Sequence, residues 1–420
     1  MIEFVRTGLS LTEAVETVVR NVTPLAVERV PLVQAIGRAL AETVTSPIDL
    51  PLWDNSSMDG YAVRRADVLS ASIINPVVLP VLATILAGGR EQPTVTEGTC
   101  ARIMTGAPIP VGADAVVRVE DTDRGVRSVR ITENRDVRSL AGNVRKRGED
   151  LRAGDIVFEA GTTLSPVHIG VLSSVGAASV LVHRLPRVVV VATGDELVDV
   201  ESFDQVQAGH RIVASTRYAL PPWLSAVGAT VRTLPLLPDN LVVIRDAIAE
   251  ALDAGCDLLI TTGGVSVGAH DYTRAALNQL DADIAFWRAR IRPGGPIGVG
   301  TVRGIPWLGL PGNPVSTMVT AELFARPLLR RLGGHATDGR LTLRVRVAES
   351  MNAGGGLTHL LRVNISRAVD GVLEARTAGA QGSNLLRTLA VANALLLVPE
   401  DRPHVDVGEY LDAIILGELR

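Results

Sequence analysis

The stretch DLLITTGGVSVGAHDYT, residues 257–273, joins an apolar run to a glycine-rich loop that ends near one aspartate. The run DLLI is typical of a buried strand, and TTGGVSVG has few side chains to cover its own backbone. Such a loop lets backbone N–H groups approach an anion closely, and the adjacent carboxylate of Asp271 suits a metal. His270 could be a ligand or base, but an ordinary loop histidine is the favoured interpretation. The stretch therefore predicts a strand that ends at an anion site.

Two other segments have the same form. RVVVVATGDEL (187–197) and IPWLGLPGNP (305–314) are apolar runs that end in turns rich in glycine or proline. Helical spacing in LVVIRDAIAEALDAG (241–255) and VSTMVTAELFARPLLRRLGG (315–334) alternates with them, which predicts a doubly wound parallel sheet. Ligands of such sheets lie beyond the carboxyl ends of the strands, where all three loops should meet. Pro221 and Pro222 predict that an intervening helix begins or kinks at Pro221.

The rest of the chain divides into smaller regions. Ser10 and Glu13 form a capping box ahead of a helical stretch that reaches Val22, and residues 30–42 predict a second short helix. LPLWDNSSMDGYAV (50–63) is interpreted as an ordered loop. Short alternating runs over residues 60–148 predict a small β-rich domain. Beyond a linker at 333–339, further alternation predicts a compact all-β domain in which no catalytic motif is evident.

Composition excludes several classes of protein. The chain has 420 residues, a net charge of −4 and 3% aromatic residues, which argues against nucleic-acid binding. Cys100 and Cys256 are its two cysteines, so neither a disulfide framework nor a zinc ribbon is expected, and both are predicted to be buried. No signal peptide and no apolar run near the roughly 20 residues of a membrane span is evident. We therefore expect a soluble, cytoplasmic protein that contacts neither membrane nor nucleic acid.

Several acidic residues follow predicted strands. Asp195 and Glu196 lie in ATGDEL, Asp239 lies in LLPDNL, and Asp271 closes the opening stretch. Their convergence at one sheet edge would raise their pKa values unless a cation offset the repulsion. Mg²⁺, which favours one or two carboxylates together with phosphate oxygens, fits this pattern. The alternative is that each acid caps a helix.

The basic and proline-rich motifs indicate a phosphorylated ligand. Arg288, Arg290 and Arg292 alternate in WRARIRPGGP, so on one strand all three would face a polyanion, although a charged edge strand is the alternative. NVRKRGED contains the basic cluster 145–147, which could equally be a surface loop. The stiff turn LPGNP (310–314) precedes a helix and predicts an anion site there. No Ser/His/Asp or Cys/His constellation is evident, so metal- and phosphate-driven chemistry is favoured over covalent catalysis.

Taken together, these motifs resemble the MoeA family, the molybdopterin molybdenumtransferases, which are related to the E domain of gephyrin. The resemblance rests on motifs that follow the family's order over most of the chain. They are SSMDGYAVR (56–64), RIMTGAPIPVGADAVV (102–117), NVRKRGED (143–150), ATGDEL (192–197), GGVSVGAHDYT (263–273), RPGGP (292–296) and LPGNPVS (310–316).

The resemblance implies a multidomain α/β fold. An elongated domain I would comprise residues 1–48 and 150–185, and a β-rich domain II residues 49–149. A MogA-like doubly wound domain III that binds molybdopterin would span 186–332, and a C-terminal β-barrel domain IV 333–420. The implied activity is insertion of molybdate into adenylylated molybdopterin with release of AMP, dependent on Mg²⁺. A homodimer with a shared active site is implied, with a molybdopterin adenylyltransferase upstream.

The resemblance also implies residue roles. Asp59, Thr105, Arg145, Asp150, Glu196, Asp239 and Asp271 match catalytic positions, the first four being supplied by the partner subunit. Glu196, Asp239 and Asp271 would also hold Mg²⁺. The implied cofactor-binding residues are Gly194, Gly263, Gly264, Ser266, Arg288, Arg292, Pro311, Gly312, Asn313 and Pro314.

The chain departs from the family at a few positions. Arg288 and Arg292 stand where lysines are usual, Gly295 replaces the lysine of PGKP, and Ala214-Ser215-Thr216 replaces D-x-N. These changes leave open a paralogue that binds the pterin or serves as a scaffold without catalysing. An enzyme that adenylylates the pterin is a further alternative, against which MDGYA and the β-rich insert argue.

Overall fold

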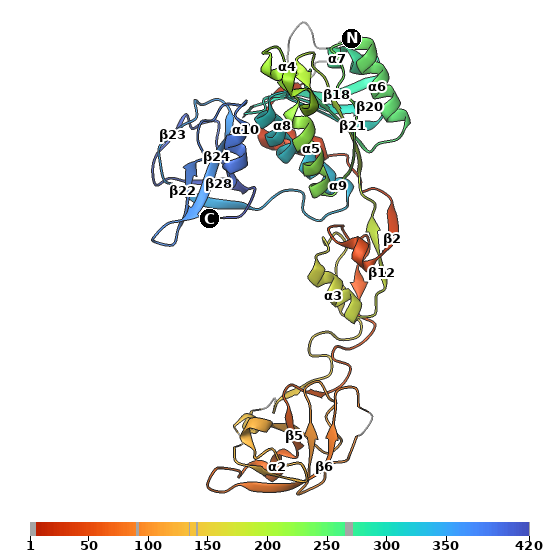
Figure 1. Ribbon diagram of the computed structural model, residues 1–420, viewed down its shortest axis with the longest axis vertical. Helices are drawn as coiled ribbons and strands as arrows, with labels where there is room; N and C mark the ends of the chain where they lie inside the picture. Colours follow the sequence, from red (N-terminus) through yellow and green to blue (C-terminus); the bar gives the residue numbers. More distant parts are fainter. Residues whose placement is uncertain (1–5, 90–91, 134, 140–141, 265–271, 420) are drawn as a thin grey trace. The chain divides into compact units, whose positions relative to one another are not determined.

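The computed structural model describes residues 6–89, 92–133, 135–139, 142–264 and 272–419. Its internal contacts divide the chain into two units, which are described separately. Unit 1 comprises Met1–Glu42, Ala160–Ser165 and Ser179–Arg420, and unit 2 comprises Thr43–Glu159 and Pro166–Ala178. Figure 1 labels their elements. Among the described residues, no helix is long and apolar enough to cross a membrane.

A seven-stranded sheet is the centre of unit 1. Its order is β1 (Arg6–Leu9), β18 (Ala282–Ala289), β20 (Pro296–Val302), β21 (Ile305–Leu310), β17 (Leu258–Thr262), β13 (Arg187–Ala192) and β16 (Thr230–Thr233). The strands β21, β17, β13 and β16 are parallel, as predicted, whereas β20 runs antiparallel to both β18 and β21. The three predicted strands are therefore neighbours, and their carboxyl ends share one edge.

Helices cover both faces of this sheet, which confirms the doubly wound prediction (Figure 1). One face carries α1 (Leu11–Val19), α5 (Ser215–Val227), α8 (Pro314–Thr320), the π-helical turn η5 (Ala321–Ala325) and α9 (Arg326–Leu332); the other carries α6 (Leu241–Asp253) and α7 (Tyr272–Asn278). Val188 and Val190 pack into the first core and Val189 and Val191 into the second. Burial on both sides explains why β13 is apolar from Val188 to Ala192.

Local signals explain where several helices begin. The predicted capping box at Ser10 is present, since Glu13 N–H donates to Ser10 Oγ and Ser10 N–H donates to the Glu13 carboxylate. The helix predicted to begin or kink at Pro221 begins at Ser215 instead, with both prolines inside it. Leu220, Leu224 and Val227 are buried against the sheet, and this packing offsets the hydrogen bonds that the prolines cannot donate.

The C-terminal part of unit 1 is the predicted β-barrel. The strands β24 (Thr358–Arg367), β25 (Leu373–Thr377), β22 (Thr342–Val347), β28 (Tyr410–Ile415) and β26 (Ala394–Val398) pair in that order, and β26 closes the ring by pairing with β24. The short β19 (Ile291–Arg292) adds to β24, and α10 (Leu386–Val391) packs beside it. Alternate strand residues fill the interior.

Unit 2 is β-rich, as predicted for residues 60–148. Its five-stranded sheet has the order β8 (Ala115–Arg118), β5 (Gly60–Val63), β7 (Cys100–Ile103), β6 (Val77–Ile85) and β9 (Ser128–Ile131). The short pairs β4 (Asn55–Ser56) with β10 (Val144–Arg145), and β3 (Val44–Thr45) with β11 (Ile156–Phe158), accompany α2 (Arg65–Val68) and α3 (Pro166–Ser174). The end of the predicted loop 50–63 is thus wrong, because GYAV forms the buried strand β5.

The helix predicted over residues 30–42 is also wrong. The segment begins as the end of β2 (Val27–Pro31), which pairs with β12 (Ser179–His183), and continues as the 3₁₀ turn η1 (Leu32–Ala35). Gly37 then takes a left-handed conformation with φ +80°, and Leu40 N–H donates to Thr162 O. The apolar residues at helical spacing are buried in an extended chain, so tertiary pairing overrides the local pattern.

A half-buried histidine just after α9 makes the stability of unit 1 depend on pH. His335 Nδ1 lies 2.7 Å from Thr163 Oγ1. Burial of the ring, then the nearby charges of Arg330 and His183, lower the pKa of His335 from 6.5 to about 4. The folded state therefore binds this proton less readily than the unfolded state, and stability present above pH 6.5 is lost as the pH falls toward 4.

Protonation of His335 is expected to lower the free energy of unfolding of unit 1 by about 2 kcal/mol as the pH falls from 6.5 to 4. This value includes a reduction for partial screening by solvent. Urea titrations followed by tryptophan fluorescence between pH 7 and 4 would measure it. His335→Gln should flatten that part of the profile, whereas His404→Gln, at a more exposed histidine on β27 (His404–Val405), should not. Parallel profiles for the wild type and His335→Gln would contradict the assignment.

Candidate functional site

The loops that follow β13, β17 and β21 meet around one cavity of about 570 Å³, which we name the strand-end cavity. Thr193 and Glu196 come from the first loop, Thr262, Gly263 and Gly264 from the second, and residues 311–314 from the third. Leu197, residues 212–216, Pro296 and Asn384 complete the lining. The predicted convergence of the three loops is therefore present, at the sheet edge where parallel α/β sheets bind ligands.

The second loop is built for close backbone approach. Gly263 and Gly264 both have positive φ, +85° and +62°, a conformation that favours glycine. A Cβ on Gly263 would lie 3.0 Å from Thr193 O, and a Cβ on Gly312 would lie 3.7 Å from the Gly263 Cα. The β17 and β21 loops thus pack backbone to backbone, which leaves their peptide groups close to any ligand. Ser266, predicted on this loop, lies outside the described residues.

The third loop is held rigidly at the start of α8. Pro314 occupies the first turn of the helix, and Thr317 Oγ1 donates to Pro311 O at 2.5 Å. Asn313 Nδ2 donates to Ser383 Oγ at 3.2 Å, and Val315 N–H donates to Ser383 O at 3.1 Å. The loop therefore has few ways to move, and its stiffness preserves the shape of the cavity.

The predicted acids are only partly brought together. Glu196 lines the cavity and folds over Gly194, where a Cβ would lie 2.7 Å from Glu196 Oε2. Asp239 is absent from the lining and pairs instead with Asp195: Asp195 N–H donates to Asp239 Oδ2 and Asp239 N–H to Asp195 Oδ1. Asp271 and His270 lie outside the described residues. Within the described residues no group of three potential ligands forms a metal site, so Glu196 is the carboxylate available to a cation in the cavity.

The three arginines do not share one strand. The strand β18 ends at Ala289, and Arg290 Nε donates to Glu400 at 2.8 Å while its Nη1 donates to Gly8 O at 2.5 Å. Arg288 and Arg292 are exposed and do not line the strand-end cavity. The expectation of one continuous cationic face is therefore wrong. The loop beyond Arg292 is also tight, since a Cβ on Gly295 would lie 3.0 Å from Ile291 O.

The remaining predicted residues lie in unit 2. Thr105 donates from both its backbone N–H and its hydroxyl to Asp59 Oδ1, each at 2.7 Å, and these bonds lower the pKa of Asp59. Arg145 is exposed on β10 and forms no ion pair with another described residue. Asp150 is also exposed, and its backbone N–H donates to Leu50 O. Asp59 and Thr105 thus form a fixed pair on this unit.

Sequence reasoning missed the contribution of the barrel. Asn384, from the segment that precedes α10, lines the strand-end cavity. That segment is held by Arg362, whose buried guanidinium donates to Thr388 Oγ1, Ala380 O and Gly382 O at 2.8 to 3.1 Å. Three threonines also line the cavity, and the sequence analysis did not predict them as site residues: Thr193, Thr216 and Thr262. Thr193 and Thr216 lie in quoted segments, ATGDEL and Ala214-Ser215-Thr216, but nothing in those segments singles out the threonine side chain.

Neither cysteine can serve as a nucleophile. Both are buried and free, as predicted. Burial raises the pKa of Cys100 to about 12 and also raises that of Cys256. A thiol with a raised pKa supplies little thiolate near neutral pH.

Comparisons with known proteins cover nearly the whole chain. Residues 9–176 match the family model of the MoeA N-terminal region (domain I and II), residues 189–331 that of a probable molybdopterin binding domain, and residues 344–416 that of the MoeA C-terminal region (domain IV). Molybdopterin molybdenumtransferase 2 of Mycobacterium tuberculosis is 38% identical over 387 residues, which cover 91% of this chain and 93% of the relative. Molybdopterin molybdenumtransferase of Nostoc sp. is 37% identical over 408 residues, covering 93% and 88%.

The fold agrees with these matches. The crystal structure of the molybdopterin biosynthesis moeA protein from Pyrococcus horikoshii OT3 superposes with a TM-score of 0.81 at 26% sequence identity. The alignment covers 97% of this chain and all of that one. The likeness therefore extends through both units and does not stop at the sheet domain.

Proposed function

The chain belongs to the MoeA family of molybdopterin molybdenumtransferases, and from this premise we propose that its strand-end cavity binds adenylylated molybdopterin and inserts molybdate with release of AMP. The chain is a transferase of molybdenum cofactor biosynthesis. The main support for this proposal is that three strand-end loops surround one cavity of about 570 Å³. That volume lies within the range of pockets that bury a cofactor-sized molecule.

Backbone groups would hold the phosphorylated end of the substrate. Gly264, Gly312 and Asn313 line the cavity, and with so little side-chain bulk around them their N–H groups are suited to phosphate oxygens. The Gly263 N–H already donates to Leu310 O, and Pro311 and Pro314 have no N–H. Fixed donors of this kind stabilise a developing oxyanion without having to reorganise during the reaction. Gly194 keeps the first loop clear of a side chain beside Glu196.

Glu196 is the proposed Mg²⁺ ligand. Mg²⁺ is commonly bound through one or two carboxylates and the phosphates of its substrate, so a single cavity carboxylate fits it. When bound, the ion would stabilise negative charge on the phosphoanhydride that links AMP to the pterin. Asp239 and Asp271 remain proposed ligands, Asp239 requiring a shift away from Asp195 N–H. Arg288 and Arg292 are exposed, and we propose that they contact the nucleotide part of the substrate when it is bound.

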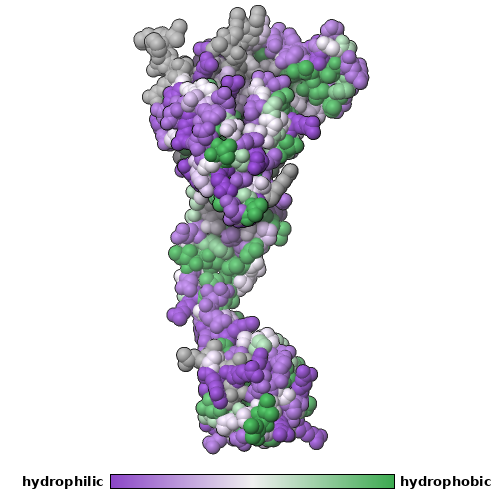
Figure 2. Space-filling view, turned by 90° about the vertical axis from the view of Figure 1, so that its left-hand side faces the viewer, coloured by the Kyte–Doolittle hydropathy of each residue, from purple (hydrophilic) through white to green (hydrophobic). Residues whose placement is uncertain are grey.

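We further propose a homodimer in which the partner subunit's Asp59, the partner's Thr105, the partner's Arg145 and the partner's Asp150 complete the site. Apolar surface on each unit supports a second copy: Val33 and Ile36 at η1 are 75% and 47% exposed, and Val167 on α3 is 77% exposed. Figure 2 shows that apolar patches are present on the face of the molecule that it draws. Large exposed apolar patches are a mark of protein interfaces.

The competing interpretations are less well supported. A paralogue that only binds or scaffolds the pterin is not favoured, because relatives that align over more than nine-tenths of the chain carry the transferase name. A molybdopterin adenylyltransferase would supply the substrate, since the proposed reaction consumes an adenylylated pterin. A cytoplasmic location stays a prediction.

AMP release tests the proposal directly. We expect the purified protein, given adenylylated molybdopterin, to release AMP only when molybdate and Mg²⁺ are both present, as measured by chromatography of the nucleotide. Omitting either ion provides the control. If the protein binds the substrate but releases no AMP with both ions present, only the binding role would survive.

The same assay on a mixture of two inactive variants tests whether the two subunits share the site. Asp59→Asn and Glu196→Gln change residues of different units, and each variant alone should be slow. In mixed dimers one of the two sites would combine the two unaltered surfaces, so activity should partly return. No recovery after subunit exchange, confirmed by mass spectrometry of the mixed species, would argue against sharing.

A further inference from the structure

A second cavity of unit 1 lies at the opposite edge of the seven-stranded sheet from the strand-end cavity. Its volume is about 490 Å³, and we name it the strand-start cavity. Cys256 and Asp257 directly precede β17, and Ile305 and Pro306 begin β21, so the cavity lies where these parallel strands start. None of the described residues lines both cavities. The strand-start cavity is therefore separate from the proposed active site.

The cavity exists because the sheet carries small residues beyond the end of α1. The helix α1 ends at Val19, and Ala285 on β18 is exposed. On β20, Gly300 leaves no room for a side chain, since a Cβ there would lie 2.2 Å from Asp283 O. The base of the cavity consists of core residues that are at most 6% exposed: Val18, Val299 and Leu332. An apolar base with a few polar groups around it is typical of sites for small organic molecules.

The charged groups of this lining, among the described residues, are two carboxylates. That of Asp257 is already neutralised, because Arg184 donates to it from Nη1 and Nη2 at 2.6 Å each and the Arg187 N–H donates at 2.8 Å. Asp283 is exposed on β18 and forms no ion pair with another described residue. No arginine or lysine of the described chain lines the cavity. Its unbalanced charge is therefore negative and lies on Asp283.

The lining narrows the class of ligand. An anion would be repelled by the Asp283 carboxylate, and a wholly apolar molecule would cover that carboxylate without pairing it. An ammonium or guanidinium group attached to an apolar ring or chain suits both the carboxylate and the base of the cavity. The volume of about 490 Å³ falls within the range of pockets that hold a small organic molecule.

We propose that the strand-start cavity binds a small organic cation, with its apolar part on Val18, Val299 and Leu332 and its charged group at Asp283. The inference goes beyond the proposed function and does not depend on it, because it concerns a different edge of the sheet. It gives the chain a second ligand site whose preference for charge is opposite to that of a phosphate site.

Three indole derivatives of similar size provide the test, since tryptamine is cationic, tryptophol is neutral and indole-3-propionate is anionic. Dissociation constants from ligand-observed NMR at low ionic strength should be about fivefold lower for tryptamine than for tryptophol, as expected of an ion pair partly open to solvent. Indole-3-propionate should bind most weakly. Asp283→Asn should remove the preference for the cation, whereas Asp281→Asn, at an exposed aspartate outside the cavity, should keep it.

Ala285→Leu tests where the ligand binds, because leucine at this exposed position would fill the cavity without entering the core. All three derivatives should then bind much more weakly, while the melting temperature stays near that of the wild type. The proposal is overturned if the wild type binds no tryptamine, if tryptophol binds as tightly, if Asp283→Asn keeps the preference, or if Ala285→Leu binds as the wild type does. AMP release should be normal in both variants, so the outcome at this cavity is independent of the outcome for the proposed function.

Discussion

Replacing Glu196 with glutamine is expected to slow AMP release about a hundredfold, the order of loss seen when one preorganised electrostatic group is removed from an active site. Glutamine keeps the size of the side chain but removes the negative charge that would bind Mg²⁺. In the strand-end cavity Glu196 is the charged side chain among the described residues, so no neighbour lining the cavity can substitute for it. The expected defect is therefore one of metal binding.

A metal readout separates this defect from general damage. Mn²⁺ titrations followed by electron paramagnetic resonance, with AMP present, should show weaker binding in Glu196→Gln, and a higher Mg²⁺ concentration should be needed for half-maximal AMP release. Glu250→Gln is the matched control, because Glu250 is exposed on α6 and lies outside the cavity. Normal Mn²⁺ affinity and normal turnover in Glu196→Gln would remove Glu196 from the proposed site.

The doubly wound fold could be predicted because both faces of its central strands are buried. A strand such as β13, apolar at every position after Arg187, has few alternatives once turns and helical periods flank it. The segment over residues 30–42 could not be predicted in the same way. Its apolar spacing is compatible with a helix, and only pairing with residues far along the chain, near Thr162 and Val182, decides against one.

The candidate site likewise has parts that the sequence predicts and parts that it does not. Its loops were predictable because glycine and proline at strand ends restrict the backbone, as at Gly263 and Pro314. Thr193 and Thr262 were not, since a β-branched residue at or just after the end of a strand is ordinary in any sheet. Thr216, in the first turn of α5, is equally ordinary. Asn384 was missed because its place depends on Arg362, which holds Ala380 and Gly382 within the barrel, and on Ser383, which bonds to Asn313 at the start of α8. Such long-range placement leaves no trace in local sequence.

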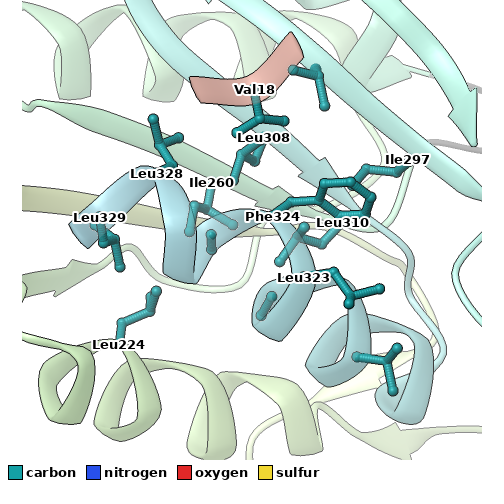
Figure 3. Close-up of a cluster of buried hydrophobic side chains, with 14 of the residues drawn as sticks. Val18, Leu224, Ile260, Ile297, Leu308, Leu310, Leu323, Phe324, Leu328 and Leu329 are labelled. Carbon is teal, nitrogen blue, oxygen red and sulfur yellow. The ribbon is translucent and has the colours of Figure 1, made fainter. Parts of the chain in front are cut away.

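Phe324→Ala is expected to cost about 3 to 5 kcal/mol of unfolding free energy, because it deletes a large side chain from a close-packed core. Phe324 is completely buried in the π-helical turn η5, and Figure 3 shows its ring beside Leu310 and near Ile297. The turn exists because Pro327 has no N–H to donate one helical turn back, while Arg326 N–H bonds to Ala321 O. A well-packed side chain is therefore needed where the helix is least regular.

The loss of stability in Phe324→Ala should be measurable at the strand-end loops as well as in the core. Residues 311–314 lead directly into α8, and α8 continues through η5, so a cavity under Phe324 loosens the support of the third loop. Hydrogen exchange of the amides in β21 and β17 would measure the local free energy, which avoids treating a multidomain unfolding transition as two-state. Phe203→Ala, at a phenylalanine of α4 (Phe203–Gln207) that is 49% exposed, is the matched control and should change exchange little. Equal protection in the two variants would mean that the core relaxes around the lost ring, and the strand-end loops would then depend on other contacts for their rigidity.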